Sequence, residues 1–332
     1  MKSTEAPMRG RDDSVFEAEL RKVAPRPIFI IGLHRSGTTF LYQTLTNTFS
    51  VASLTAYHAL HYDRVLLQHR EGTATAAREE LDGLFRSWGM ATRRIDDVAL
   101  SHAMLEEYGW VLRRHAGVFY TNARTAPLVD EICRKLHILT PSAEAVLLKN
   151  PWDAGHAGDL LAHFHDARFI FMQRDPVAIV NSQFRFARYS GLTKDPYLHM
   201  LLGGIPLGRT WMRLQRAVRK AAGGSWHGRI ALSYILRDVT RGLGRLEASW
   251  TAVPPRRRVA LDYSSLVRDP DGTLEKVARS LGLSPRRDRV RMEPNPRDPT
   301  LLPEVAAAEA GFRRRLSEKG ITQRPLDEIR MS

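Results

Sequence analysis

Four short apolar runs stand out along the chain, and each ends at glycine, proline or charged residues. They lie at residues 27–33, 145–151, 167–176 and 258–263. A short, almost continuously apolar run is typical of a parallel strand that is covered on both faces. The longer segments between these runs carry apolar residues at helical spacing. This alternation predicts an α/β fold in which helices flank a central parallel sheet.

Local signals mark where several of these helices begin. Residues 40–45 follow the first run and place their apolar side chains on one helical face. Asp175 and Pro176 follow the third run as an N-cap and a first helical residue. Pro270 and Gly272 mark the start of a further helix. Three of the four predicted strands are therefore followed by a marked helical segment.

No internal repeat interrupts this pattern, so we expect residues 1–332 to form a single α/β domain. Residues 1–26 are polar and read as an N-terminal extension. Residues 55–140 and 186–255 contain few strand signals, and we expect both to be helical insertions that contact a ligand.

The chain has 50 Lys and Arg against 36 Asp and Glu, so its formal net charge is +14. Such an excess favours an anionic partner, which leaves a nucleic acid, a membrane surface or a small phosphorylated ligand. The arginines are scattered, and no basic stripe alternates with aromatic residues as a single-strand binding groove requires. We therefore expect no specific nucleic-acid function.

Cys133 is the only cysteine, which excludes an intramolecular disulfide and favours a reducing, cytoplasmic compartment. The polar N-terminus does not resemble a secretory signal peptide. No run approaches the roughly 20 apolar residues that cross a bilayer, so we expect no transmembrane segment. Peripheral contact with a membrane stays open, because it needs only a charged or apolar surface.

The loop after the first predicted strand carries the clearest chemistry. Its pattern, Gly32-x4-Gly37-Thr38-Thr39, predicts a turn whose backbone N–H groups and following helix hold an anion. A nucleoside-triphosphate loop has lysine where this chain has Thr38, and the cation here is Arg35. The loop therefore favours a terminal phosphate or phosphosulfate.

These residues, GLHRSGTTFL, resemble the 5′-phosphosulfate loop of sulfotransferases that use 3′-phosphoadenosine 5′-phosphosulfate (PAPS). In that family an arginine closing a strand and a serine eight residues later bind the 3′-phosphate, and Arg174 and Ser182 have this spacing. The resemblance also implies a strand-end lysine near the transferred group, Lys149, and a tyrosine near the adenine, Tyr263. The cofactor-binding residues it implies are Arg35, Ser36, Gly37, Thr38, Thr39, Arg174, Ser182 and Tyr263.

The resemblance implies transfer of a sulfuryl group from PAPS to a hydroxyl or amine. Arg35 and Lys149 are then the expected catalytic cations, because charge develops on the leaving phosphate. Arg313, Arg314 and Arg315, with the following Lys319 and Gly320, are candidates to close over the 3′-phosphate. We expect no metal, since two histidine pairs, His58 with His61 and His163 with His165, lack an accompanying set of carboxylates.

The general base is the point at which the chain departs from the family. Relatives place histidine two or four residues after the lysine, where this chain has Pro151 and Asp153. Others use a glutamate about 20 residues after the loop arginine, and the corresponding stretch, SLTAYHALHY, has no carboxylate. It does contain His58, which we favour because histidine titrates near neutrality. The alternatives left open are Asp153, His34 and His156.

Two other functions remain open on sequence grounds. A P-loop kinase of a small metabolite would use the same loop, although Thr38 replaces its lysine. A non-catalytic binder of polyanions would use the net charge. For a sulfotransferase, the two helical insertions would bind the acceptor, which the sequence leaves open as a small molecule, a carbohydrate or a lipid.

Overall fold

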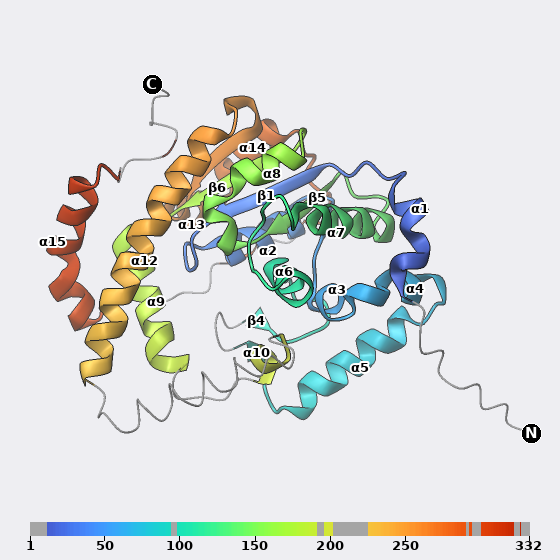
Figure 1. The fold of residues 1–332 in the computed structure, drawn as a ribbon, viewed down its shortest axis with the longest axis horizontal. Helices are drawn as coiled ribbons and strands as arrows, with labels where there is room; N and C mark the ends of the chain where they lie inside the picture. Colours follow the sequence, from blue (N-terminus) through green and yellow to red (C-terminus); the bar gives the residue numbers. More distant parts are fainter. Residues whose placement is uncertain are drawn as a thin grey trace, which may run out of the picture.

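A five-stranded parallel sheet forms the centre of the computed structural model, with strand order β2-β5-β1-β6-β7 (Figure 1). The structure describes residues 12–93, 98–190, 196–201, 225–289, 292–293, 300–321 and 326. The strands are β1 (Pro27–Gly32), β2 (Val51–Ser53), β5 (Ala145–Lys149), β6 (Arg168–Gln173) and β7 (Arg258–Asp262). The predicted α/β fold with a flanked parallel sheet is confirmed.

All four predicted strands are present, as β1, β5, β6 and β7. The edge strand β2 was not predicted, because its three residues are too short to show a pattern. The first insertion, residues 55–140, was predicted to be helical. It also contains a hairpin of two short antiparallel strands, β3 (Thr92–Arg93) and β4 (Val98–Ala99).

Helices make up most of the rest of the described chain (Figure 1). The α-helices are α1 (Glu17–Leu20), α2 (Thr38–Thr48), α3 (Ala56–Leu60), α4 (Val65–Arg70), α5 (Ala74–Ser87), α6 (Gly109–Ala116), α7 (Ala126–Leu139), α8 (Ala157–His163), α9 (Pro176–Ser190), α10 (Pro196–Leu201), α12 (Ser225–Ala252), α13 (Tyr263–Arg268), α14 (Pro270–Leu281) and α15 (Pro303–Glu318). The 3-10 helices are η1 (Asp13–Phe16), η2 (Tyr62–Arg64), η3 (Pro151–Gly155) and η4 (Pro255–Arg257).

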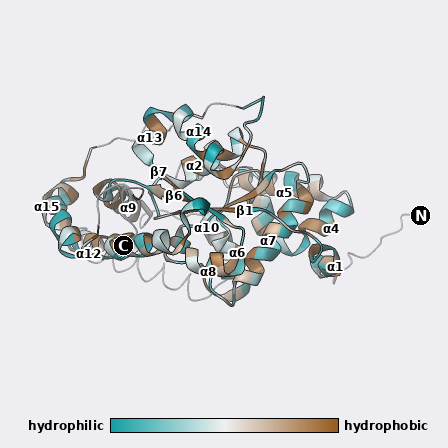
Figure 2. Ribbon diagram, turned by 90° about the horizontal axis from the view of Figure 1, so that it is seen from above, coloured by the Kyte–Doolittle hydropathy of each residue, from teal (hydrophilic) through white to brown (hydrophobic). Residues whose placement is uncertain are grey.

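Alternate residues of the central strand β1 enter two different cores. Ile28 and Ile30 pack with apolar residues of α2, α13 and α14, whereas Phe29 and Ile31 pack with α7, α8, α9 and α12. Figure 2 shows α2, α13 and α14 on one side of the sheet and α7, α8 and α12 on the other. This explains why β1 is apolar at every position, since neither face meets water.

The helix starts predicted from local signals are also present. Asp175 accepts a hydrogen bond from the N–H of Ala178 at 2.9 Å and so caps α9. Asp269 caps α14 through the N–H of Gly272 at 3.0 Å. The glycine pair predicted to break the second insertion, Gly223 and Gly224, lies outside the described residues. No described helix combines the length and the apolar character that crossing a membrane requires.

Candidate functional site

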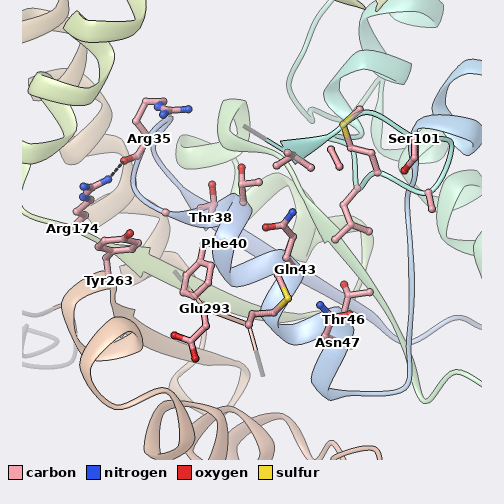
Figure 3. Close-up of a pocket in the computed structure, with 18 residues that line it drawn as sticks. Arg35, Thr38, Phe40, Gln43, Thr46, Asn47, Ser101, Arg174, Tyr263 and Glu293 are labelled. Atoms are coloured by element: carbon pink, nitrogen blue, oxygen red, sulfur yellow. Dashed lines mark hydrogen bonds between the residues drawn. The ribbon is translucent and has the colours of Figure 1, made fainter. Parts of the chain in front are cut away.

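A pocket of about 530 Å³ opens at the carboxyl ends of the sheet strands (Figure 3). Open parallel sheets commonly bind ligands at this edge. Arg35, Arg174 and Tyr263 lie at one end of the pocket in Figure 3, and Ser101 lies at the other. The predicted loop residues Gly37, Thr38 and Thr39 also line it, as do Phe40, Gln43, Thr46, Asn47, Val98, Ala99, Ala103, Met104, Leu105, Met292 and Glu293.

The loop between β1 and α2 is closed by its own backbone and by Ser36. The N–H and the hydroxyl of Ser36 both donate to the carbonyl of Leu33, at 3.1 and 2.7 Å. Gly37 has a φ of 99°, and a Cβ there would lie 2.3 Å from the Tyr263 ring. Only glycine fits this position, both for its conformation and for the close approach of the ring. The loop thus presents the N-terminus of α2 to the pocket.

Arg174 and Ser182, predicted to act together, both contact Arg35, Arg174 from the carboxyl end of β6 and Ser182 from the second turn of α9. The guanidinium of Arg174 lies over the Tyr263 ring, 4.4 Å from its centroid, and donates to the carbonyl of Arg35 at 2.9 Å. The hydroxyl of Ser182 accepts a hydrogen bond from Nε of Arg35 at 3.1 Å. Arg35 therefore contacts both residues, which are 8 positions apart in sequence.

Lys149 ends β5 on the other side of the predicted phosphate-binding loop, residues 32–39, which we call the phosphate loop. Its side chain is only 3% exposed, and Nζ donates to Oγ1 of Thr39 at 3.0 Å. Nζ also lies 2.7 Å from Oε1 of Glu107. A buried ammonium group needs such partners, because its desolvation is otherwise costly. The structure thus joins the loop, the strand-end lysine and a carboxylate in one place.

Comparison with known proteins supports the motif analysis. A model of the sulfotransferase family matches residues 27–222, which is more than half of the chain. The chain belongs to the sulfotransferase family. The family predicted from the residues around Arg35, Lys149 and Arg174 is therefore confirmed.

Two curated relatives show the same likeness over most of this chain. The proteins named omega-hydroxy-beta-dihydromenaquinone-9 sulfotransferase Stf3 from Mycobacterium tuberculosis and Mycobacterium bovis are 23% identical over 286 residues. The alignment covers 79% of this chain and 64% of each relative, so the chain spans less than two thirds of their length.

Two solved structures share the fold. Sulfotransferase STF1 from M. tuberculosis H37Rv has a TM-score of 0.54 at 19% identity, covering 83% of this chain and 73% of that chain. Sulfotransferase STF9 from Mycobacterium avium has a TM-score of 0.55 at 18% identity, covering 96% of this chain and 77% of that chain. Both structural alignments cover far more of this chain than the central sheet.

Glu107 is a site residue that sequence analysis missed. It lies just before α6, inside the first helical insertion, and its side chain is 17% exposed. It is 42 positions from Lys149 in sequence, with no motif around it. No signal in the sequence could have paired the two, because the contact depends on how the insertion packs against the end of β5.

Asp153, one of the open alternatives for the general base, lies in the protein core. Its side chain is fully buried and accepts hydrogen bonds from the hydroxyls of Tyr108 and Thr121, the N–H of Thr121 and the amide of Asn150. Burial raises the pKa of Asp153, while these donors oppose the rise. A carboxylate enclosed by four donors has no direction from which to reach an acceptor, so Asp153 is a structural residue.

Gly109 explains how α6 comes so close to the end of β5. A Cβ at this position would lie 2.6 Å from Oδ1 of Asn150 and 2.7 Å from the Trp152 ring. The amide of Asn150 also donates to the carbonyl of Phe119 at 2.9 Å. Because α6 begins at Gly109, this close contact brings the preceding residue pair, including Glu107, against Lys149.

His58, the base favoured from sequence, has a different local role. It is the third residue of α3, where its Nδ1 accepts the N–H of Thr55 at 3.3 Å and its own N–H donates to Oγ1 of Thr55 at 3.4 Å. This reciprocal arrangement is a capping box. Burial, and then the nearby Arg78, lower the pKa of His58 to about 4. The structure instead brings the carboxylate of Glu107 to within 2.7 Å of Nζ of Lys149.

The other two histidines differ in their surroundings. Nδ1 of His156 pairs with Asp159 at 2.9 Å, and its ring stacks on Tyr120, away from the pocket-lining residues. His34 belongs to the phosphate loop and lies edge-on to Trp152, with ring centroids 4.8 Å apart. Burial lowers the pKa of His34, and Glu107 acts in the opposite direction. Glu107 therefore acts on the pKa of His34, which links this histidine to the pair of Glu107 and Lys149.

Several half-buried aromatic residues pack near His34 of the phosphate loop. Trp152 stacks on Phe119 at 4.5 Å, and Trp110 lies edge-on to both at 5.3 Å. With His34 these rings form a cluster that we call the aromatic corner. They come from the phosphate loop, from α6 and the segment after it, and from η3, which directly follows Lys149.

The C-terminal arginines lie on α15, which packs against α9 and α12 (Figure 1). Arg313 pairs with Asp175 at 3.0 Å and with Glu309 at 2.9 Å. Asp175 follows Arg174, so α15 is fastened beside the predicted 3′-phosphate residues. Arg314 pairs with Glu318 at 3.6 Å on the helix surface. Within the described part of the chain, no cluster of three His, Cys, Asp or Glu could hold a metal.

Proposed function

We propose that this protein transfers the sulfuryl group of PAPS to a hydroxyl group on an apolar small molecule or lipid. The observation that carries the proposal is the placement of two cationic groups at opposite sides of one phosphate loop. Lys149 meets the loop at Thr39, and Arg174 meets it at the carbonyl of Arg35. A nucleotide with phosphates at both its 3′ and 5′ positions matches this separation of charge.

The pocket also suits the nucleoside of such a donor. Phe40 and Tyr263 lie next to each other in Figure 3, between the arginines and the outer face of α2. Two rings at this point can hold a planar purine by stacking. The first N–H groups of α2 and the positive end of its dipole face the 5′-phosphosulfate. No metal is needed in this proposal, because fixed cations and N–H groups neutralise the phosphates.

The transfer step uses Lys149 and Glu107. The acceptor oxygen attacks sulfur, the bond between sulfur and the bridging phosphate oxygen breaks, and that oxygen keeps the bonding electrons. Lys149 and the loop N–H groups stabilise the charge that develops there. Glu107, 2.7 Å from Lys149, takes the proton of the attacking hydroxyl. We therefore replace His58 with Glu107 as the proposed base.

The aromatic corner supports an apolar acceptor. Trp152, Phe119 and Trp110 are half-buried and contact one another. Trp152 lies three residues after Lys149, and Trp110 lies three residues after Glu107. Such rings bind hydrocarbon and planar groups more favourably than sugars with many hydroxyls. The curated relatives are named for a hydroxylated menaquinone, an acceptor of this kind.

Two measurements test the proposal. Calorimetry should show micromolar binding of adenosine 3′,5′-bisphosphate, weakened at least tenfold in Arg174→Ala or Ser182→Ala. Incubation with labelled PAPS should then yield labelled product from a panel of lipid alcohols and phenols. Binding of ATP with magnesium but not of the bisphosphate would contradict the proposal and favour a kinase. Binding of the bisphosphate with transfer only to sugars would keep the reaction and overturn the acceptor class.

A further inference from the structure

The outer side of α12 exposes apolar and basic residues together. In the part of the chain that the structure describes, five large apolar residues are exposed, and two of them, Ile230 and Tyr234, lie one turn apart on this helix. Ile230 is 51% exposed, and Tyr234, at 63%, is the most exposed of the five. Single apolar residues are common on protein surfaces, so this pair is informative through the residues that lie beside it.

Three exposed arginines continue the same line along the helix. Arg237, Arg241 and Arg245 follow Tyr234 at spacings of three, four and four residues, which places them on the side of α12 that carries Ile230 and Tyr234. No acidic side chain in the described part of the chain forms an ion pair with any of the three. The helix exposes Asp238 beside them, so its outer side carries a net positive charge. The α12 face, as we call it, consists of Ile230, Tyr234, Arg237, Arg241 and Arg245.

We propose that the α12 face docks on a membrane surface that carries anionic lipid headgroups. Each cation close to such a surface strengthens binding roughly fivefold. Ile230 and Tyr234 then enter the interfacial layer, where tyrosine is favoured because its ring is apolar and its hydroxyl is polar. A soluble polyanion would match the arginines but would leave the apolar pair in water. The inference rests on the proposed function, since docking would bring the enzyme to a lipid acceptor.

One helix separates the α12 face from the phosphate loop. A Cβ at Gly242 would lie 2.5 Å from Cδ2 of Leu33, so the inner side of α12 rests on this loop. At the end of the face, the stem of Arg245 packs on η3, because a Cβ at Gly155 would lie 3.1 Å from Cβ of Arg245. The same short helix carries Trp152 of the aromatic corner. Docking therefore places a bilayer about one helix diameter, roughly 10 Å, from the phosphate loop.

Sedimentation with lipid vesicles tests the arginines without donor or acceptor. We expect the wild type to bind vesicles of phosphatidylglycerol mixed with phosphatidylcholine and not vesicles of phosphatidylcholine alone. Arg237→Gln combined with Arg241→Gln should weaken binding roughly 10- to 30-fold. Arg268→Gln combined with Arg279→Gln is the matched control, because it removes two exposed arginines from α13 and α14, on the other side of the sheet (Figure 2). The control should change binding less than about threefold.

A second pair of variants tests the apolar residues. Ile230→Ser combined with Tyr234→Ser should weaken vesicle binding roughly tenfold, because less apolar surface leaves water. Val15→Ser combined with Leu84→Ser is its control, since these residues are 58% and 42% exposed on other helices. It should leave binding within about twofold of the wild type. All four double variants change exposed side chains, so thermal melting should show them folded like the wild type.

A dye on a single cysteine shows which face meets the bilayer. Cys133 is buried, so a new cysteine at the exposed position of Ser233, next to Tyr234, can be labelled selectively. An environment-sensitive dye on Ser233→Cys should shift its emission to the blue when anionic vesicles are added. The same dye on Ser87→Cys, at an exposed position at the end of α5, should not shift.

Several results would overturn the inference. One is the absence of binding by the wild type to anionic vesicles, and another is equal binding by the α12 variants and their controls. A shift on Ser87→Cys as large as that on Ser233→Cys would also contradict it. Retention on heparin without vesicle binding would assign the face to a soluble polyanion. Failure of the wild type to bind adenosine 3′,5′-bisphosphate would instead overturn the proposed function, and the vesicle measurements do not depend on it.

Discussion

The carboxylate of Asp153 accepts a hydrogen bond from the hydroxyl of Tyr108, the residue that follows Glu107 in the chain. Both side chains are buried, and Asp153 is four residues beyond Lys149. The two partners of this bond therefore belong to the same two chain segments as the proposed catalytic pair, Glu107 and Lys149. Asp153 also accepts from Thr121, which fixes the segment after α6 to the same point. This arrangement holds the insertion against the end of β5.

Removal of Asp153 should therefore destabilise the whole protein. Asp153→Ala leaves four buried donors without their acceptor, and we expect a loss of about 3–5 kcal/mol in the free energy of unfolding. Tyr108→Phe removes a single donor and should cost about 1–2 kcal/mol. Urea denaturation monitored by circular dichroism measures both values. If Asp153→Ala stayed within 1 kcal/mol of the wild type while losing all turnover, Asp153 would be a catalytic residue after all.

We expect Gly109 not to tolerate an added methyl group, because its neighbours leave no room for a Cβ. Gly109→Ala pushes a Cβ to within 2.6 Å of Asn150 and 2.7 Å of Trp152, so α6 must shift away from η3. We expect a loss of roughly 1–3 kcal/mol in stability and a fall in turnover that exceeds the change in bisphosphate affinity.

Gly244→Ala is the matched control for Gly109→Ala. Gly244 lies in α12, where an added Cβ would meet no atom within 4 Å. Alanine should stabilise this helix by about 0.5–1 kcal/mol. Thermal melting of both variants, with turnover measured on the same samples, gives the comparison. Equal effects of the two substitutions would show that α6 does not depend on the close contact.

The pKa of His58, lowered to about 4, predicts a loss of stability in acid. The unfolded chain protonates this residue near 6.5, so between pH 6.5 and 4 the unfolded state binds more protons than the folded state. The stability that His58 contributes is therefore complete above pH 6.5 and falls as the pH approaches 4. A shift of this size corresponds to at most about 3 kcal/mol.

His58→Gln isolates this contribution. Glutamine can keep the capping contact with Thr55 but does not titrate. The variant should unfold at the same urea concentration as the wild type at pH 7.5 and at a higher one at pH 4.5. It should also keep most of its turnover at pH 7.5. A turnover loss of 100-fold or more would restore His58 as the general base.

The central sheet was predictable because its strands are buried on both faces. Strand β1 shows this directly, since Ile28 and Phe29 enter different cores and leave no polar position in the run. Glycine and capping residues such as Asp175 then marked the ends of neighbouring elements. The edge strand β2 gave no such signal, because three residues with alternating exposure also occur in ordinary loops.

The shape of the predicted phosphate loop could be anticipated for a different reason. It depends on backbone conformation, and Gly37 must be glycine for the loop to form at all. The proposed base was not predictable, because Glu107 reaches Lys149 through the packing of residues 55–140, in which no recognised motif surrounds Glu107. His58 was favoured on the position of a titratable side chain alone. The structure uses that side chain for a helix cap.

Glu107→Gln tests the proposed base through two effects of opposite direction. Glutamine cannot take the proton of the acceptor hydroxyl, so turnover should fall roughly 100-fold or more. It also removes a negative charge 2.7 Å from the ammonium group that meets the donor, so adenosine 3′,5′-bisphosphate should bind as tightly as before or more tightly. A residue with a purely structural role would not separate turnover from affinity in this way.

Glu131→Gln provides the control within the same protein. Glu131 pairs with another buried lysine, Lys135, at 3.0 Å on α7, away from the residues that line the pocket. Breaking that pair changes the same kinds of groups without touching the site, so turnover should stay within about twofold of the wild type. Labelled PAPS with the acceptor found in the panel measures turnover for both variants. If Glu107→Gln kept its turnover, His34 would be the next candidate, since its imidazole lies in the phosphate loop and the charges of Glu107 and Lys149 both act on its pKa.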